Sequence, residues 1–127
     1  MLIEYAGGMK LVVRHRGLEA VTDQPRDQGG DDTAMTPTEL FVAALGSCAG
    51  VYVLNFAKRH YIPVDGMTIQ VEYTYAERPR RVGSVEVRVK MPKRADQQYR
   101  APLQRAAEQC LVHNSLRQPP QVTISVE

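Results

Sequence analysis

The chain has 127 residues, of which 24% are charged and 43% hydrophobic, values typical of one folded globular domain. Its 16 basic and 14 acidic residues give a net charge of +2, too balanced to favour nucleic acid or an anionic membrane as partner. Disorder is also disfavoured, because it requires low hydrophobicity together with high net charge. We therefore expect a single domain covering residues 1–127.

The first third of the chain is expected to form short strands and then a loop. Two apolar-rich runs, residues 1–5 and 9–15, are separated by Gly7 and Gly8, which is typical of a hairpin. A third strand is predicted at residues 18–22. Residues 23–33 are rich in Asp, Gln and Gly and have no periodicity, so they predict an exposed loop.

The strongest predicted element is a long helix from Thr36 to about His60. Thr36, Pro37 and Glu39 have the order of a capping box, in which the first hydroxyl and the later carboxylate each accept a backbone N–H. Residues 40–57 include no charged side chain, and apolar residues fall on every helical face, so the helix needs burial all round. A chain of this length is short for that task, and we infer an obligate homodimer.

Strands and a second helix are predicted after the long helix. Residues 67–75 and 82–91 alternate apolar and polar side chains, as the two strands of a half-buried antiparallel hairpin do. An amphipathic helix is expected from residue 96 to about residue 113, with Cys110 on its inner face, and a final strand at residues 122–126. The order predicts an α+β fold with a mostly antiparallel sheet and two long helices.

Neither membrane insertion nor export nor metal binding is expected from the pattern. We find no stretch with the apolar length of a membrane span, and the first residues lack the segments of a signal peptide. The two cysteines form no Cys-x-x-Cys pair, and the three histidines have no zinc-ligand spacing. We expect a cytoplasmic protein with reduced thiols, without a metal or cofactor.

Cys48 and Cys110 are the candidate reactive residues. Cys48 lies between Gly46 and Gly50 in the long helix, and small neighbours there indicate either close helix–helix contact or room for a molecule to reach the sulfur. Free cysteines are most often inert buried hydrophobes, which is the alternative for both residues. Two inward cysteines on different elements can instead form a pair, one attacking and one resolving.

Two segments resemble motifs of the OsmC/Ohr superfamily. TPTELFVAALGSCAG at residues 36–50 is similar to the family's long-helix motif, in which Pro-x-Glu-Leu leads to Ala-Leu-Gly-Ser-Cys. EQCLVHNSL at residues 108–116 resembles its second motif, of the type Glu-Lys-Cys-Pro-Val-His-Asn-Thr-Leu, with Leu111 in the place of the proline. The resemblance extends from about residue 9 to residue 127 and implies an OsmC-like fold in an intertwined homodimer.

The resemblance implies a two-cysteine peroxidase. Cys48, as a thiolate, would attack an organic hydroperoxide, Cys110 would resolve the product to a disulfide, and an external dithiol would reduce it. The family supplies an arginine to the thiolate from an early strand or turn that precedes a glycine, and a guanidinium there lowers the thiol pKa. Arg16 fits that place and Arg14 is the fallback, while simple solvation is the alternative for a surface arginine.

One position departs from the hydroperoxide-reducing members. They carry a glutamate directly after the motif's proline, ten residues before the first cysteine, where it pairs with the arginine; here that residue is Thr38. Glu39 is one step along, about 100° around the helix, and is expected to act as a helix-start carboxylate. The pattern resembles the less characterised OsmC-like branch. His113 either assists a thiolate or bonds a terminal helix carbonyl.

Two functions therefore follow as hypotheses. The first is a homodimeric hydroperoxide reductase, its site between subunits, with an apolar pocket that favours alkyl or lipid hydroperoxides. We expect that pocket to include Phe41, Leu45, Tyr52 and Phe56. The alternative is a module of the same fold that binds an apolar small ligand and whose cysteines are inert.

Overall fold

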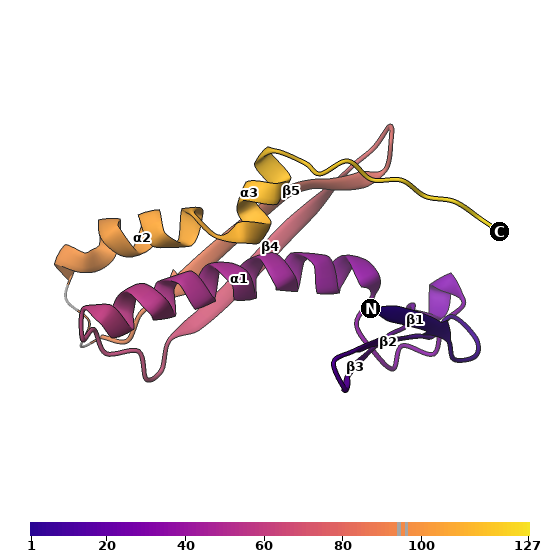
Figure 1. The fold of residues 1–127 in the computed structure, drawn as a ribbon, viewed down its shortest axis with the longest axis horizontal. Coiled ribbons are helices and arrows are strands. Elements are labelled where there is room, and N and C mark those ends of the chain that lie inside the picture. Colours follow the sequence, from indigo (N-terminus) through magenta and orange to yellow (C-terminus); the bar gives the residue numbers. More distant parts are fainter. Residues whose placement is uncertain (94, 96) are drawn as a thin grey trace. The chain divides into compact units, whose positions relative to one another are not determined.

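The computed structural model of this chain describes residues 1–93, 95 and 97–127, and its elements follow the predicted α+β order (Figure 1). The chain divides into two compact units, Met1–Phe41 and Val42–Glu127. Each unit carries its own antiparallel sheet, of three strands in the first and two in the second. One domain over residues 1–127 stays a prediction.

The first unit is built on strands β1 (Leu2–Tyr5), β2 (Leu11–His15) and β3 (Leu18–Thr22), which pair in that order. The predicted hairpin and third strand are thus confirmed. Arg16 and Gly17 make the turn between β2 and β3, with φ angles of 55° and 77°. Positive φ at both central residues is the geometry of a type I′ turn, one of the two favoured two-residue hairpin turns.

The loop over residues 23–33 is largely exposed, as expected, but it is organised around one buried carboxylate that the sequence did not predict. Asp23 is 1% exposed and accepts hydrogen bonds from the backbone N–H of Gln24 (2.8 Å), Asp31 (3.2 Å) and Thr33 (3.1 Å), and from the Thr33 hydroxyl (2.8 Å). Burial by itself raises the pKa of Asp23, but the bonds from Thr33, Gln24 and Asp31 outweigh it and lower the pKa to about 2. A short 3₁₀ turn, Arg26–Gln28, lies within the loop.

The long helix α1 (Pro37–Arg59) begins and ends where the sequence predicts. Its capping box is complete: the Thr36 N–H donates to Glu39 Oε2 (2.7 Å), and the Glu39 N–H donates to Thr36 Oγ1 (3.2 Å). Lys58 and Arg59 lie in the last turn, where cations favour the negative end of a helix.

Only one face of α1 is buried within the chain, although its composition predicts burial all round. The buried residues recur every three or four positions: Val42, Leu45, Gly46, Ala49, Gly50, Val53 and Ala57. Val51, on another face, is 51% exposed.

By length and composition α1 could also cross a membrane, with mean hydropathy 1.8, so the expectation that no stretch reaches the apolar length of a membrane span is wrong. Core helices of folded proteins meet the same standard, and the buried stripe of α1 is that of a core helix.

Strands β4 (Thr68–Ala76) and β5 (Arg81–Lys90) form the predicted hairpin, which packs against α1 in the second unit. Their side chains alternate between half-buried and exposed, as expected. A Cβ added to Gly46 would lie 2.5 Å from Val71 Cγ2, and one added to Gly50 would lie 2.3 Å from Ile69 Cδ1. The glycines therefore allow close contact between α1 and β4, and not between two helices.

The predicted second helix is broken in two. A 3₁₀ turn (Gln97–Tyr99) leads into α2 (Arg100–Glu108), and α3 (Leu111–Arg117) follows after a break at Cys110; residue 96, the predicted start, lies outside the described residues. Periodicity did not detect the break, because apolar residues recur at helical spacing across it.

No strand forms at residues 122–126 in the described chain, which corrects the last predicted element. Val122, Ile124 and Val126 are 73%, 86% and 97% exposed. A strand needs a neighbouring strand for its backbone hydrogen bonds. The alternation of apolar and polar residues in this segment describes only how its side chains would be placed, and does not supply that neighbour.

Two apolar clusters make the core of the second unit. One consists of Val53, Ala57, Ile62 and Leu103 and joins α1 to α2, which lie side by side in Figure 1. The other consists of Leu45, Ala49 and Cys110, with Cys48 packed against it. The second cluster therefore brings both cysteines into one region of the core.

Candidate thiol site

The two cysteines lie next to each other in the second unit. Cys48 comes from the middle of α1 and is half-buried, whereas Cys110 comes from the break between α2 and α3 and is 0% exposed. Their side chains interact, and both are free thiols. The juxtaposition is what a pair of attacking and resolving cysteines requires, and sequence periodicity could not predict it.

Cys110 occupies the N-cap position of α3 rather than the interior of a helix. Its backbone is extended, with φ −65° and ψ 146°, and its sulfur accepts the backbone N–H of His113 at 3.4 Å. Burial raises the pKa of the Cys110 thiol, and the neighbouring Cys48 raises it further, while the N–H groups of His113 and Val112 oppose the change. Cys110 is therefore held as a neutral thiol near pH 7.

The His113 ring does not bond the sulfur. Its Nδ1 lies 2.7 Å from the carbonyl oxygen of Glu108, and because a carbonyl only accepts, Nδ1 donates. This is the helix-end role, one of the two roles that the sequence left open for this residue. The backbone of His113, and not its imidazole, reaches Cys110.

Glu39 acts as the helix-start carboxylate that its position predicts. Its side chain accepts the Thr36 N–H and so forms half of the capping box of α1. Thr38 occupies the position where hydroperoxide-reducing relatives are expected to carry a glutamate.

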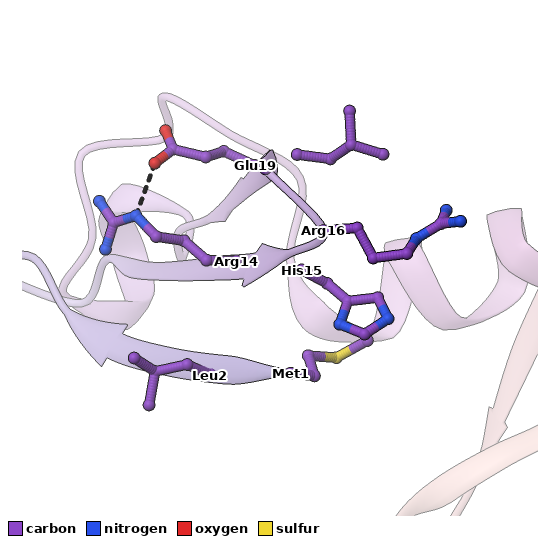
Figure 2. A pocket seen from close by; sticks show the side chains of 8 residues that line it. Met1, Leu2, Arg14, His15, Arg16 and Glu19 are labelled. Carbon is purple, nitrogen blue, oxygen red and sulfur yellow. Dashed lines mark hydrogen bonds and ion pairs between the residues drawn. The ribbon is translucent and has the colours of Figure 1, made fainter.

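Arg16 belongs to the first unit, whereas both cysteines belong to the second. Its side chain lines a pocket of about 460 Å³ at the turn between β2 and β3, together with those of His15 and Arg14 (Figure 2). Arg14 is engaged by Glu4 and Glu19, and Figure 2 shows it pointing away from Arg16. Of the two candidates, Arg16 is thus the one outside this ion-pair network, and its pairing with Cys48 stays a prediction.

A groove of about 930 Å³ lies along the second unit between α1, β5 and α2. Its lining is mixed. The apolar part includes Leu45 and Val53 from α1 and Leu103 from α2, and charged side chains such as Arg88, Arg100 and Glu108 line it as well, together with Cys110 and His113.

Only Leu45 of the four residues expected in an apolar pocket lines this groove. Tyr52 packs against the Cys110 cluster, and Phe56 stacks on His60 with ring centroids 4.2 Å apart. Phe41 ends the first unit. The groove is instead formed largely by β5 and α2, whose contribution depends on tertiary contacts that the sequence pattern does not reveal.

Metal ligation finds no support in the described part of the chain, residues 1–93, 95 and 97–127. No three His, Cys, Asp or Glu side chains there are grouped so that they could hold an ion.

Comparisons with known proteins identify the family and the fold of this chain. The model of the family described as OsmC-like protein matches residues 29–125. A solved structure from Psychrobacter arcticus 273-4, assigned to the osmotic stress and detoxification response, is 28% identical, with a TM-score of 0.83 over 90% of this chain and 85% of that one. Proteins of curated function give no match.

Two more distant structures share the fold. An organic hydroperoxide resistance protein OsmC from Legionella pneumophila is 19% identical, with a TM-score of 0.62 over 90% of this chain and 91% of that one. An OsmC-like protein from Mycoplasma pneumoniae is 11% identical, with a TM-score of 0.71 over 87% and 80%. With the family match over most of its length and two adjacent cysteines in its core, the chain belongs to the family of OsmC-like proteins.

Proposed function

We propose that this chain is a thiol-dependent peroxidase that reduces organic hydroperoxides in the cytoplasm, with Cys48 attacking and Cys110 resolving. The observation that carries the proposal is the contact between the two thiols inside one apolar cluster. The family also includes proteins described by organic hydroperoxide resistance, such as the one from Legionella pneumophila.

The two thiols differ in the way that these roles demand. Cys110 is fully buried and its pKa is raised, so it is a poor first nucleophile, because the thiolate is the reactive form. Cys48 is half-buried and therefore easier for a substrate to reach. We accordingly assign the attack on the peroxide to Cys48.

The proposed reaction balances in three steps. The Cys48 thiolate attacks the terminal peroxide oxygen, so an S–O bond forms, the O–O bond breaks and the alkoxide leaves to become an alcohol on protonation. The Cys110 sulfur then attacks the Cys48 sulfenic acid, which forms the disulfide and releases water. An external dithiol exchanges with the disulfide and restores both thiols.

Arg16 is the proposed source of positive charge for the Cys48 thiolate and the departing alkoxide. A guanidinium stays charged at all physiological pH values and stabilises an adjacent anion. Arg14 is the weaker candidate because Glu4 and Glu19 already engage it.

We further propose that the working unit is an intertwined homodimer with the site between subunits. The support is the apolar surface left uncovered in one chain: α1 has no charged residue between positions 40 and 57, yet it buries one stripe only. The exposed Val122, Ile124 and Val126 add to that surface. Sedimentation should give a mass near twice the 14.2 kDa of the chain; a monomer at micromolar concentration would contradict this part of the proposal.

The test of activity uses reduced protein, cumene hydroperoxide and a dithiol, with loss of peroxide followed over time. Cys48→Ser should abolish the turnover. When the dithiol is left out, Cys110→Ser should consume one equivalent of peroxide and stop at the sulfenic acid, whereas the wild type should consume one equivalent and stop at the Cys48–Cys110 disulfide. The matched control is Ser47→Ala, at an exposed residue of α1 next to Cys48, and it should keep wild-type turnover. If Cys48→Ser consumes peroxide as fast as the wild type, the mechanism is wrong.

The alternative, a module that binds an apolar small ligand, is supported by one observation, the groove of about 930 Å³ whose lining includes Leu45, Val53 and Leu103. It predicts that native thiols resist peroxide. Mass spectrometry after mild treatment with cumene hydroperoxide separates the two functions: a Cys48–Cys110 disulfide supports the enzyme, and unmodified thiols support the binding module.

A further inference from the structure

The break between α2 and α3 falls at the residue assigned the resolving role. The backbone ladder of α2 ends with the Cys110 N–H donating to Ala107 O (3.2 Å), and it resumes when the Asn114 N–H donates to Cys110 O (3.0 Å). Between them Cys110 has the extended backbone of an N-cap residue. Apolar residues recur at helical spacing through this segment, so the apolar pattern does not account for the break. Specific interactions must hold it.

The residue after Cys110 does not itself enforce the break. Leu111 is the first residue of α3, and leucine leaves the backbone of the preceding residue unrestricted. A proline at this position would lack the N–H that continues a helix and would restrict the preceding residue to extended backbone.

Two side chains of α3 reach back across the break. The His113 ring donates from Nδ1 to the carbonyl of Glu108 at 2.7 Å, and the Asn114 amide donates from Nδ2 to the carbonyl of Gln109 at 3.2 Å. These two carbonyls are the last before the break, at the end of α2. Because the backbone hydrogen bonds of the helix stop there, these carbonyls have no partner within the helix. Both bonds join the first turn of α3 to the end of α2.

We propose that His113 and Asn114 are positioning residues that hold the break at Cys110, and so keep the Cys110 sulfur directed toward Cys48. This inference rests on the proposed function, which it deepens, and assigns these two residues a role in the resolving step. Disulfides form only within a narrow range of Cα separation and side-chain direction. Were α2 and α3 to merge into one helix, the Cys110 backbone would turn from extended to helical and its sulfur would be redirected.

The test measures disulfide formation without any peroxide. Wild-type protein is equilibrated in glutathione redox buffers, in which oxidised glutathione gains two electrons, the two thiols lose them, and two reduced glutathione molecules are released. Mass spectrometry then gives the effective concentration of one thiol toward the other. His113→Phe and Asn114→Asp each remove one donor at nearly constant shape, and each should lower it by about five-fold, the usual worth of one hydrogen bond.

Rescue separates positioning from general stability. Leu111→Pro supplies the missing restriction, and it should restore the effective concentration of His113→Phe and Asn114→Asp to within about two-fold of wild type. Ser115→Ala is the matched control: it removes a bond from Ser115 Oγ to Leu111 O (2.9 Å) that lies within α3 and does not cross the break. It should leave the effective concentration unchanged.

Three results would overturn the proposal: a wild type that forms no Cys48–Cys110 disulfide, donor variants equal to wild type, or a Leu111→Pro background that fails to restore them. Should a donor variant unfold, its Leu111→Pro form must fold and regain the disulfide, or the proposal fails. Absence of peroxide turnover in a wild type that oxidises normally in glutathione would refute the proposed function and leave this inference intact.

Discussion

The two compact units of this chain keep their folds by different means. In Met1–Phe41, the buried side chains among the described residues are Thr22 and Asp23, and the loop at 23–33 is organised by hydrogen bonds to one carboxylate. In Val42–Glu127 the core consists of two apolar clusters, with helix and strand brought close by glycine. The amino-acid composition of the whole chain is that of an ordinary globular domain and does not reveal this difference between the two units.

Because of this difference, we expect the stability of each unit to respond to a different kind of substitution. Apolar cores respond to volume, because interiors are close-packed and a missing methylene leaves a void. A buried carboxylate that satisfies several N–H groups responds to charge and protonation instead. Substitutions that change only size should therefore act on the second unit, and those that change only charge should act on the first.

The largest expected effect is that of Leu103→Ala in the second unit. Leu103 is 6% exposed in the cluster that joins α1 to α2, and a Leu→Ala change at such a site costs about 2–5 kcal/mol. Leu116→Ala, at a residue 43% exposed, is the control and should cost about 1 kcal/mol or less. Urea unfolding at fixed protein concentration measures both, and equal losses would contradict the assignment of the core.

A finer volume test compares Gly46→Ala with Gly50→Ala on α1. Alanine gains about 1 kcal/mol of helix propensity at either position, against an overpacking cost of about 1–3 kcal/mol. At Gly50 the clash is with the end of the flexible Ile69 side chain, whereas at Gly46 it is with the stiff, β-branched Val71. Gly46→Ala should therefore lower the thermal midpoint and Gly50→Ala should change it less; the reverse order would show that the contact with β4 is looser at Gly46.

Asp23→Asn tests the first unit by changing charge at nearly constant size. Three of the four bonds go to Oδ2, so the amide oxygen is expected to take that place and keep the bonds from Asp31 and Thr33. The amide nitrogen then replaces Oδ1 and leaves the Gln24 N–H without its acceptor. Amide hydrogen exchange at residue 24 should accelerate about tenfold or more. Exchange in β4 and β5 should not change, and uniform acceleration of both units would refute the division.

Acid should destabilise the first unit selectively, and this loss should be absent near neutral pH, where Asp23 is ionised. The pKa of Asp23 is about 2 in the fold, below its ordinary value of 3.8, so the stabilisation is complete above about pH 4 and is lost as pH falls toward 2. Exchange at residues 31 and 33, corrected for intrinsic rates, should rise over that window. The Asp23→Asn protein should show no such rise, and an identical rise in both proteins would place the titrating group elsewhere.

Patterns that depend on neighbours in sequence were predictable. The capping box of Thr36 and Glu39 and the alternation of β4 and β5 depend on local spacing and formed as expected. The break at Cys110 was not predictable, because its partners are side chains that return to carbonyls across a junction where apolar periodicity continues. The burial of Asp23 was missed because its partners come from eight and ten residues further along an aperiodic loop.

The candidate site was only partly within reach of the sequence. Resemblance identified Cys48 and Cys110, but their contact arises from α1 meeting the end of α2, which spacing cannot show. The expected pocket residues Tyr52 and Phe56 were apolar helix positions that turned out to face core clusters. The residues that line the groove, from β5 and α2, had been interpreted only as an amphipathic strand and helix.

The turn at Arg16 has a consequence for how its role can be separated from folding. Its φ of 55° is a conformation that glycine, asparagine and aspartate adopt more readily than arginine. A strained residue at a functional site trades stability for activity, so at this position a substitution should move the two in opposite directions. An Arg16→Asn chain is expected to be at least as stable as the native one, so any activity that it loses is attributable to the guanidinium alone.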